Sequence, residues 1–106
     1  MTRLGYAQPA LDDLRDILDY INESDPAAAR RVLGAIRHVA DLLPSNPKLG
    51  KRGRVRRTRE LVVAGAPYII VDQLSSDAIV VLAILHTARD LPRALRGRLT
   101  RREQIP

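Results

Sequence analysis

Apolar and polar positions alternate with a helical period in the first half of the chain. Over residues 9–23 apolar side chains recur every three or four positions, and aspartate and arginine fill the positions between them. That spacing predicts an amphipathic helix. Ser24-Asp25-Pro26 interrupts the pattern with a capping aspartate and a proline suited to a first helical position, and helical spacing resumes through Leu43. Two antiparallel helices are therefore expected.

The second half of the chain has the pattern of β-strands. Three apolar runs lie at residues 54–63, 67–74 and 78–86, with connections short enough for antiparallel hairpins. In the last run both alternating sets of positions are apolar, which is typical of a central strand. Residues 3–8 predict a further short strand ahead of Pro9, and residues 44–53, with two prolines and two glycines, predict a loop.

These elements predict an α+β fold, in which an N-terminal helical hairpin packs on a small antiparallel β-sheet of three to four strands. The hairpin is expected to cover one face of the sheet, and the sequence does not assign a cover to the other. With 106 residues, the chain has the size of one domain with one core and one site. We take residues 1–106 as a single domain with a basic C-terminal tail from about residue 93.

Composition excludes several classes of function. The chain has no cysteine and two histidines, so no metal site and no cofactor are expected. Phenylalanine and tryptophan are absent, which argues against platforms for stacking nucleobases. The N-terminus lacks the pattern of a signal peptide, and no apolar run approaches the roughly 20 residues that cross a bilayer. These features predict a cytoplasmic protein without membrane contact.

Positive charge is concentrated in one segment. The net charge is +6, and residues 48–59 carry seven basic side chains and no acidic one, immediately before an apolar strand. A cationic surface beside a rigid sheet indicates an anionic partner. The predicted partner-binding surface consists of Lys51, Arg52, Arg54, Arg56, Arg57 and Arg59.

Several short pieces occur together in a characteristic order. They are Asp13-Leu14, Ile17 and Tyr20-Ile21, then Pro26-Ala27-Ala28-Ala29, then Pro47 with Gly50-Lys51-Arg52-Gly53-Arg54-Val55, Thr58-Arg59-Glu60-Leu61-Val62-Val63, Pro67-Tyr68-Ile69-Ile70-Val71 and Ile84-Leu85-His86-Thr87-Ala88-Arg89 with Pro92. Over residues 3–92 this order resembles the RelE/ParE superfamily of bacterial toxins, closest to the ParE-like, plasmid-stabilisation branch. Asp72 departs from the family, which commonly has an aromatic residue there.

The resemblance implies the toxin of a type II toxin–antitoxin pair, held by a cognate antitoxin protein in a hetero-oligomer. ParE-like members inhibit DNA gyrase, whereas RelE-like members cleave messenger RNA on the ribosome. We expect a gyrase inhibitor that blocks replication by binding, with no catalytic residues. Two alternatives stay open. One is a metal-independent, ribosome-dependent endoribonuclease using Arg54, Arg59 and His86, and the other is a non-toxic, antitoxin-binding member of the fold.

The candidate residues favour binding over cleavage. RNA cleavage without a metal needs a base, an acid and cations around the phosphate. The resemblance implies that a RelE-like nuclease would carry an aromatic or basic catalytic element after the last strand. Here no tyrosine follows Tyr68, and the arginines of the C-terminal segment stay protonated at neutral pH. In a strand beginning at Arg54, the side chains of Arg54 and Arg56 share one face and that of Arg59 the other, which favours a buried role for Arg59.

Other candidates have supporting roles. Glu60 is interpreted as the charge partner of an arginine rather than a general base, and His86 as a packing residue at the end of the central strand. Tyr68 and Arg89 complete the supporting set. The antitoxin is expected on exposed apolar surface of the first helix and at the sheet edge, through groove binding or strand addition. The apolar helix residues assigned to it are Leu11, Leu14 and Leu18.

Overall fold

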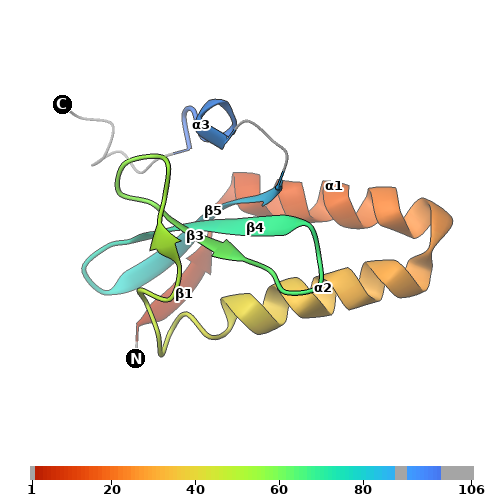
Figure 1. Ribbon diagram of the computed structural model, residues 1–106, viewed down its shortest axis with the longest axis horizontal. Helices are drawn as coiled ribbons and strands as arrows, with labels where there is room; N and C mark the ends of the chain where they lie inside the picture. Colours follow the sequence, from red (N-terminus) through yellow and green to blue (C-terminus); the bar gives the residue numbers. More distant parts are fainter. Residues whose placement is uncertain (1, 88–90, 99–106) are drawn as a thin grey trace.

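Two long helices form a hairpin along one face of a five-stranded sheet in the computed structural model, which describes residues 2–87 and 91–98 (Figure 1). The elements are β1 (Arg3–Tyr6), α1 (Gln8–Ser24), α2 (Pro26–Ala40), β2 (Lys51–Arg52), β3 (Arg59–Val62), β4 (Tyr68–Leu74), β5 (Ala78–His86) and α3 (Leu91–Ala94). The α+β class and the helical hairpin predicted from the sequence are confirmed.

The two helices begin where their sequence signals predict. Pro9 lies in the first turn of α1, after Ala7 in an extended conformation. The Asp25 side chain accepts a hydrogen bond of 3.0 Å from the main-chain nitrogen of Ala28 and so caps α2. α2 ends at Ala40, before the predicted Leu43, although Leu43 remains fully buried.

The sheet is mixed rather than antiparallel, with strand order β1-β5-β4-β3-β2. β1 pairs in parallel with β5, from Arg3 opposite Ala78 to Tyr6 opposite Val81, and the other neighbouring strands are antiparallel. The prediction of a three- to four-stranded antiparallel sheet was therefore wrong in strand number and in direction at this edge. Partners so distant in sequence leave no local pattern that would reveal the parallel pair.

The predicted strand at residues 54–63 was also wrong at its start. β3 begins at Arg59, and residues 53–58 form the loop of a hairpin whose first strand, β2, lies inside the segment predicted to be irregular. Arg57 has a φ of 65°, which no extended strand contains. The assignment of Arg54 and Arg56 to one strand face therefore does not apply.

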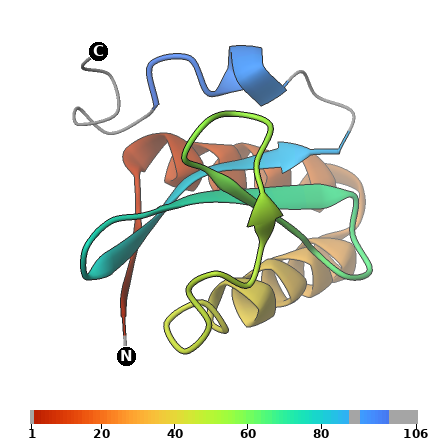
Figure 2. The same cartoon turned by 60° about the vertical axis from the view of Figure 1, so that its left-hand side comes forward.

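Both faces of the sheet carry packed apolar side chains. The hairpin side includes Ile36 and Ala40 from α2 with Ile70 and Ile84 from the central strands. On the opposite face, Leu95 is 2% exposed and packs with side chains of β4 and β5, and Figure 2 shows α3 on the side of the sheet away from α2. The segment after β5 thus provides the cover that the sequence left unassigned.

An ion pair fastens that C-terminal segment to α1. The Asp13 carboxylate accepts hydrogen bonds of 2.7 and 3.2 Å from the Arg98 guanidinium and one of 3.0 Å from the main-chain nitrogen of Ile84. Both charged side chains are largely buried. Asp13 therefore connects α1, the outer edge of β5 and the segment that follows α3.

Candidate functional site: a cationic hairpin loop

Residues 53–58, here called the basic loop, connect β2 to β3 in a defined conformation. The main-chain nitrogen of Gly53 donates a 2.7 Å hydrogen bond to the carbonyl of Thr58. Thr58 in turn donates from its main-chain nitrogen (3.2 Å) and its hydroxyl (2.6 Å) to the carbonyl of Val55. Because Thr58 is only 2% exposed, these bonds are shielded from water and fix the loop against the sheet.

Two positions in the basic loop restrict which residue type fits without strain. A Cβ atom on residue 53 would lie 2.9 Å from the carbonyl oxygen of Thr58 and even closer to its hydroxyl, so only glycine fits without displacing the chain. Arg57 adopts a left-handed conformation with a φ of 65°. A non-glycine residue there costs about 1–2 kcal/mol, which the surrounding contacts must offset.

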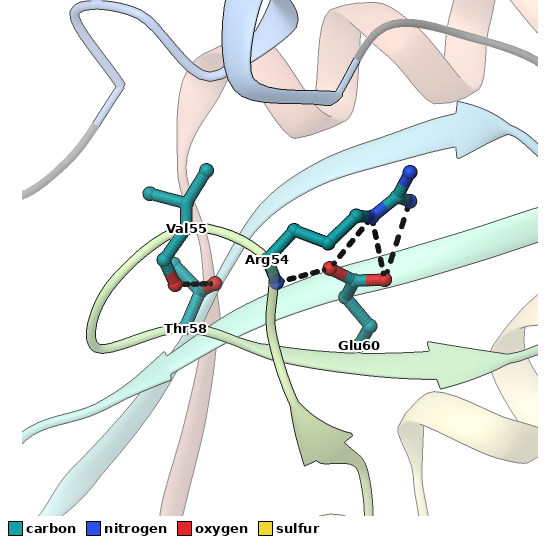
Figure 3. A network of polar contacts seen from close by, with 4 residues as sticks. All are labelled: Arg54, Val55, Thr58 and Glu60. Carbon is teal, nitrogen blue, oxygen red and sulfur yellow. Dashed lines mark hydrogen bonds and ion pairs between the residues drawn. The ribbon is translucent and has the colours of Figure 1, made fainter.

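Glu60 anchors the loop from β3, as Figure 3 shows. Its carboxylate accepts a 2.7 Å hydrogen bond from the main-chain nitrogen of Arg54 and further bonds of 3.2 and 3.3 Å from the guanidinium of the same residue. The Glu60 side chain is 2% exposed, whereas that of Arg54 is 50% exposed. The predicted role of Glu60 as the partner of an arginine is confirmed by these contacts.

The environment of Glu60 keeps its carboxylate ionised. Burial acts to raise its pKa, but the hydrogen bonds from Arg54 and the charges of Arg54 and Lys51 outweigh burial and hold the pKa below its usual value. Glu60 therefore stays charged through the neutral range. A carboxylate in this state is an acceptor and has no proton to give.

The basic loop and the strands beside it enclose a hollow of about 540 Å³. Its lining consists of Arg52, Gly53, Arg54, Arg56, Arg57, Thr58, Arg59 and Leu74. Five of the six residues predicted to form the basic surface thus meet at one place. The sixth, Lys51, lies exposed on β2 opposite Glu60 in the hairpin register.

The lining of this hollow, as far as the structure describes it, can bind anions but offers no group that exchanges a proton at neutral pH. Guanidinium groups remain protonated, and the Thr58 hydroxyl donates to a main-chain carbonyl. Arg59 is half-buried and donates a 3.0 Å hydrogen bond to the carbonyl of Gly50. It therefore also ties the preceding loop to the sheet.

His86 lies in a different hollow, of about 310 Å³, beside α1 and the end of β5. Its ring meets that of Tyr68 edge to face, with 5.8 Å between the ring centroids. His86 pairs with Tyr68 in the sheet, whereas Arg59 pairs with Asp72, four residues further along β4. At about 3.3 Å per residue that offset is about 13 Å along the strand, so Arg59 and His86 do not converge on one phosphate.

The residues assigned to the antitoxin surface differ in accessibility. Leu11 is 42% exposed, whereas Leu14 is half-buried against the core. Leu18 lines a shallow hollow of about 180 Å³ between α1 and α2. Tyr20, which the sequence analysis did not assign to this surface, is 78% exposed on α1. Arg89 lies outside the described residues.

Asp72 is a buried charge that the sequence analysis noted only as a departure from the family. It is 0% exposed, and within the described parts of the chain neither carboxylate oxygen has a hydrogen-bond partner. Burial raises its pKa to about 6, an effect that the charge of Arg59 on the neighbouring strand only partly offsets. Its position on β4 was predictable, but its lack of a partner was not.

Comparison with known proteins places this geometry in a family. Residues 4–91 match the sequence model of the ParE toxin of the type II toxin-antitoxin system parDE. The chain belongs to the ParE toxin family. It is 39% identical over 93 residues to the protein Y4kP of Sinorhizobium fredii, described as a candidate toxin, with 88% of this chain and 96% of that protein covered.

This ParE-family chain is also similar in sequence to a protein that carries a RelE name. It is 34% identical over 89 residues to the toxin RelE2 of Caulobacter vibrioides, with 84% of this chain and 99% of that protein covered. Its fold is similar to that of a chain from the chromosomal ParDE toxin–antitoxin system of P. aeruginosa, with a TM-score of 0.74, 22% identity, and 81% of this chain and 96% of that chain covered. Within residues 2–87 and 91–98, no helix is long and apolar enough to cross a bilayer.

Proposed function

We propose that this ParE-family toxin blocks replication by binding DNA gyrase through the basic loop, and that a cognate antitoxin holds it inactive in a hetero-oligomer in the cytoplasm. One observation supports this function above the others. Five arginines line a hollow in which none of the described side chains is suited to proton transfer at neutral pH. Such a site favours inhibition by binding over chemistry.

The endoribonuclease alternative has less structural support. Its three candidate residues divide between two hollows, with Arg54 and Arg59 beside the basic loop and His86 beside α1. A transition state for RNA cleavage needs its proton donor or acceptor within hydrogen-bond reach of the atoms that the cations stabilise. The offset of about 13 Å along the strand between Arg59 and His86 does not provide that arrangement.

The antitoxin surface is assigned to α1 on the basis of exposure. Leu11 is exposed there, and Leu18, seven positions later on the same side of α1, lines the shallow hollow between α1 and α2, whereas Tyr20 lies on the other side of the helix beside His86. An apolar helix face beside such a hollow is suited to an amphipathic partner segment. Replacing Leu11 with aspartate is expected to weaken the complex without changing the free toxin's action on gyrase.

The test is supercoiling of a relaxed plasmid by purified gyrase, with a parallel check for trapped double-strand breaks. The wild-type protein is expected to inhibit supercoiling, and the variant Arg56→Ala/Arg57→Ala to lose most of that inhibition. The matched control, Arg30→Ala/Arg31→Ala, removes two exposed arginines from α2 and is expected to inhibit as the wild type does.

Other outcomes would replace the proposal. Full supercoiling at a several-fold excess of folded protein, together with cuts inside codons mapped by primer extension, would assign the protein to the ribosome-dependent nucleases. Absence of both effects, with unimpaired growth of cells that express it without antitoxin, would assign it to the non-toxic members.

A further inference from the structure

The hollow beside the basic loop has a composition that selects one class of anion. The described residues that line it include five arginines and no acidic residue, with Leu74 as the one large apolar residue among them, and one of the arginines, Arg54, is paired with Glu60 from β3. We propose that this hollow binds the sugar–phosphate backbone of duplex DNA, independently of sequence. The inference rests on the proposed function, because the duplex that the toxin would meet is the DNA bound to gyrase.

Phosphate fits this lining better than a nucleobase does. Guanidinium groups form bidentate hydrogen bonds to phosphate oxygens. Stacked bases would need aromatic side chains beside the arginines. The described residues of the lining include no aromatic side chain, and the apolar one among them, Leu74, is the last residue of β4. What remains is recognition of charge at regular spacing, which a nucleic-acid backbone provides.

The basic loop is fixed before any partner arrives, and this raises its capacity to bind. Thr58 and Glu60 are 2% and 3% exposed and hold the loop through hydrogen bonds to Val55 and Arg54. Ordering a flexible loop on binding would consume part of the interaction energy. Because the loop is already ordered, binding a phosphate would not have to offset the entropy of fixing its backbone.

The left-handed conformation of Arg57 also supports a binding role for the basic loop. A glycine would occupy that position without strain, yet the chain places a charged residue there at a cost. Strained residues are retained where the surrounding structure fixes them, and they gather at sites that clamp ligands. Figure 1 shows the loop projecting beyond the ends of β2 and β3, and Val55 within it packs against the apolar cluster of β4 and β5.

The experiment measures binding of the full-length protein to a fluorescein-labelled duplex by anisotropy, without gyrase, over about 50 to 200 mM KCl. The slope of log K against log salt concentration is negative, and each phosphate contact adds about 0.9 to its magnitude. Arg56→Ala is therefore expected to reduce the magnitude of the slope by about 0.9 and the affinity about eightfold at about 0.1 M salt. Arg56→Lys keeps the charge and is expected to keep the slope. Arg52→Ala/Arg56→Ala/Arg57→Ala is expected to abolish detectable binding.

The matched control is Arg15→Ala/Arg30→Ala/Arg31→Ala, which removes three exposed arginines from α1 and α2. Circular dichroism establishes that every variant is folded. The proposal is wrong if the loop and control variants bind the duplex within twofold of each other. It is also wrong if poly-glutamate or a single-stranded RNA of equal charge binds more tightly than the duplex, since the site would then suit an acidic protein or an RNA strand.

The duplex assay and the gyrase assay fail independently. Duplex binding that depends on the basic loop, with no effect on supercoiling, would retain the phosphate site and refute the proposed function. Inhibition of gyrase by a protein that does not bind the duplex would refute the phosphate site and leave the proposed function in place.

Discussion

Replacing Asp72 with asparagine is expected to stabilise the folded protein at neutral pH and to change its stability little in acid. Asp72 is 0% exposed, and its carboxylate oxygens have no hydrogen-bond partner in the described structure. Ionising such a group inside the protein is costly. Asparagine has nearly the same shape and carries no charge at any pH, so the substitution isolates the cost of the charge.

The magnitude follows from the pKa of Asp72. Burial raises that pKa from 3.8 to about 6, with partial compensation from Arg59. At 1.36 kcal/mol per pKa unit, this difference corresponds to about 3 kcal/mol. The folded state binds the proton more tightly than the unfolded chain, so stability falls as the pH rises through the window from about 4 to about 6. The full penalty applies above about pH 7, where Asp72→Asn is expected to be more stable by about 3 kcal/mol.

The assay is urea denaturation followed by far-ultraviolet circular dichroism at several pH values between about 4 and 8, analysed as a two-state transition. Asp77→Asn is the control, because Asp77 is exposed and pairs with exposed Arg3, and its effect is expected to stay below about 1 kcal/mol. A stability difference between wild type and Asp72→Asn that does not vary with pH would refute the reasoning. So would a variant that is less stable than the wild type at pH about 8.

Three further substitutions test the basic loop and the C-terminal contact. Gly53→Ala is expected to lower the free energy of unfolding, measured by urea denaturation, by about 1–3 kcal/mol because the added Cβ meets Thr58. The control Gly34→Ala on α2, which has open space around it, is expected to raise the free energy of unfolding by about 0.5–1 kcal/mol. Equal effects of the two substitutions would contradict the close contact at Gly53. Arg57→Gly is expected to weaken duplex binding and to raise Tm, because glycine adopts the left-handed conformation of residue 57 without strain. Arg57→Ala is expected to weaken duplex binding without raising Tm. Equal Tm values for the two variants would argue against backbone strain at residue 57. Asp13→Asn is expected to lower the free energy of unfolding by about 2–3 kcal/mol, because the ion pair with Arg98 is lost. It is also expected to speed amide hydrogen exchange at Ile84, whose main-chain nitrogen donates to Asp13. Unchanged exchange at Ile84 would show that this contact does not stabilise the strand.

Sequence patterns identified the elements whose stabilisation is local. The period of three to four and the Asp25-Pro26 signal located both helices, and the apolar runs located β4 and β5. The parallel pairing of β1 with β5 was not predictable, because it depends on where the hairpin returns the chain and not on any residue of β1. That pairing is a property of the whole fold.

The basic loop shows the same division at shorter range. Its charges and the role of Glu60 were predictable, but its backbone was not. Alternation of Val55 with arginines suggested a strand, and the hydrogen bonds of Thr58 with the turn at Arg57 overrode that tendency. The strand prediction assigned Arg59 to the face opposite Arg54 and Arg56, whereas the folded loop brings all three to one hollow.

The shortness of β2 has a consequence for solubility. Lys51 and Arg52 are its whole length, both are exposed, and they form one border of the sheet. An unpaired border invites another chain to add its own strand, and natural sheets prevent this with very short, charged edge strands. Lys51 and Arg52 thus have two roles. They contribute to the charged surface, and they prevent the sheet edges of separate copies from pairing with each other. Substituting them with apolar residues would give a protein that assembles with itself, a change visible by light scattering well before any loss of fold.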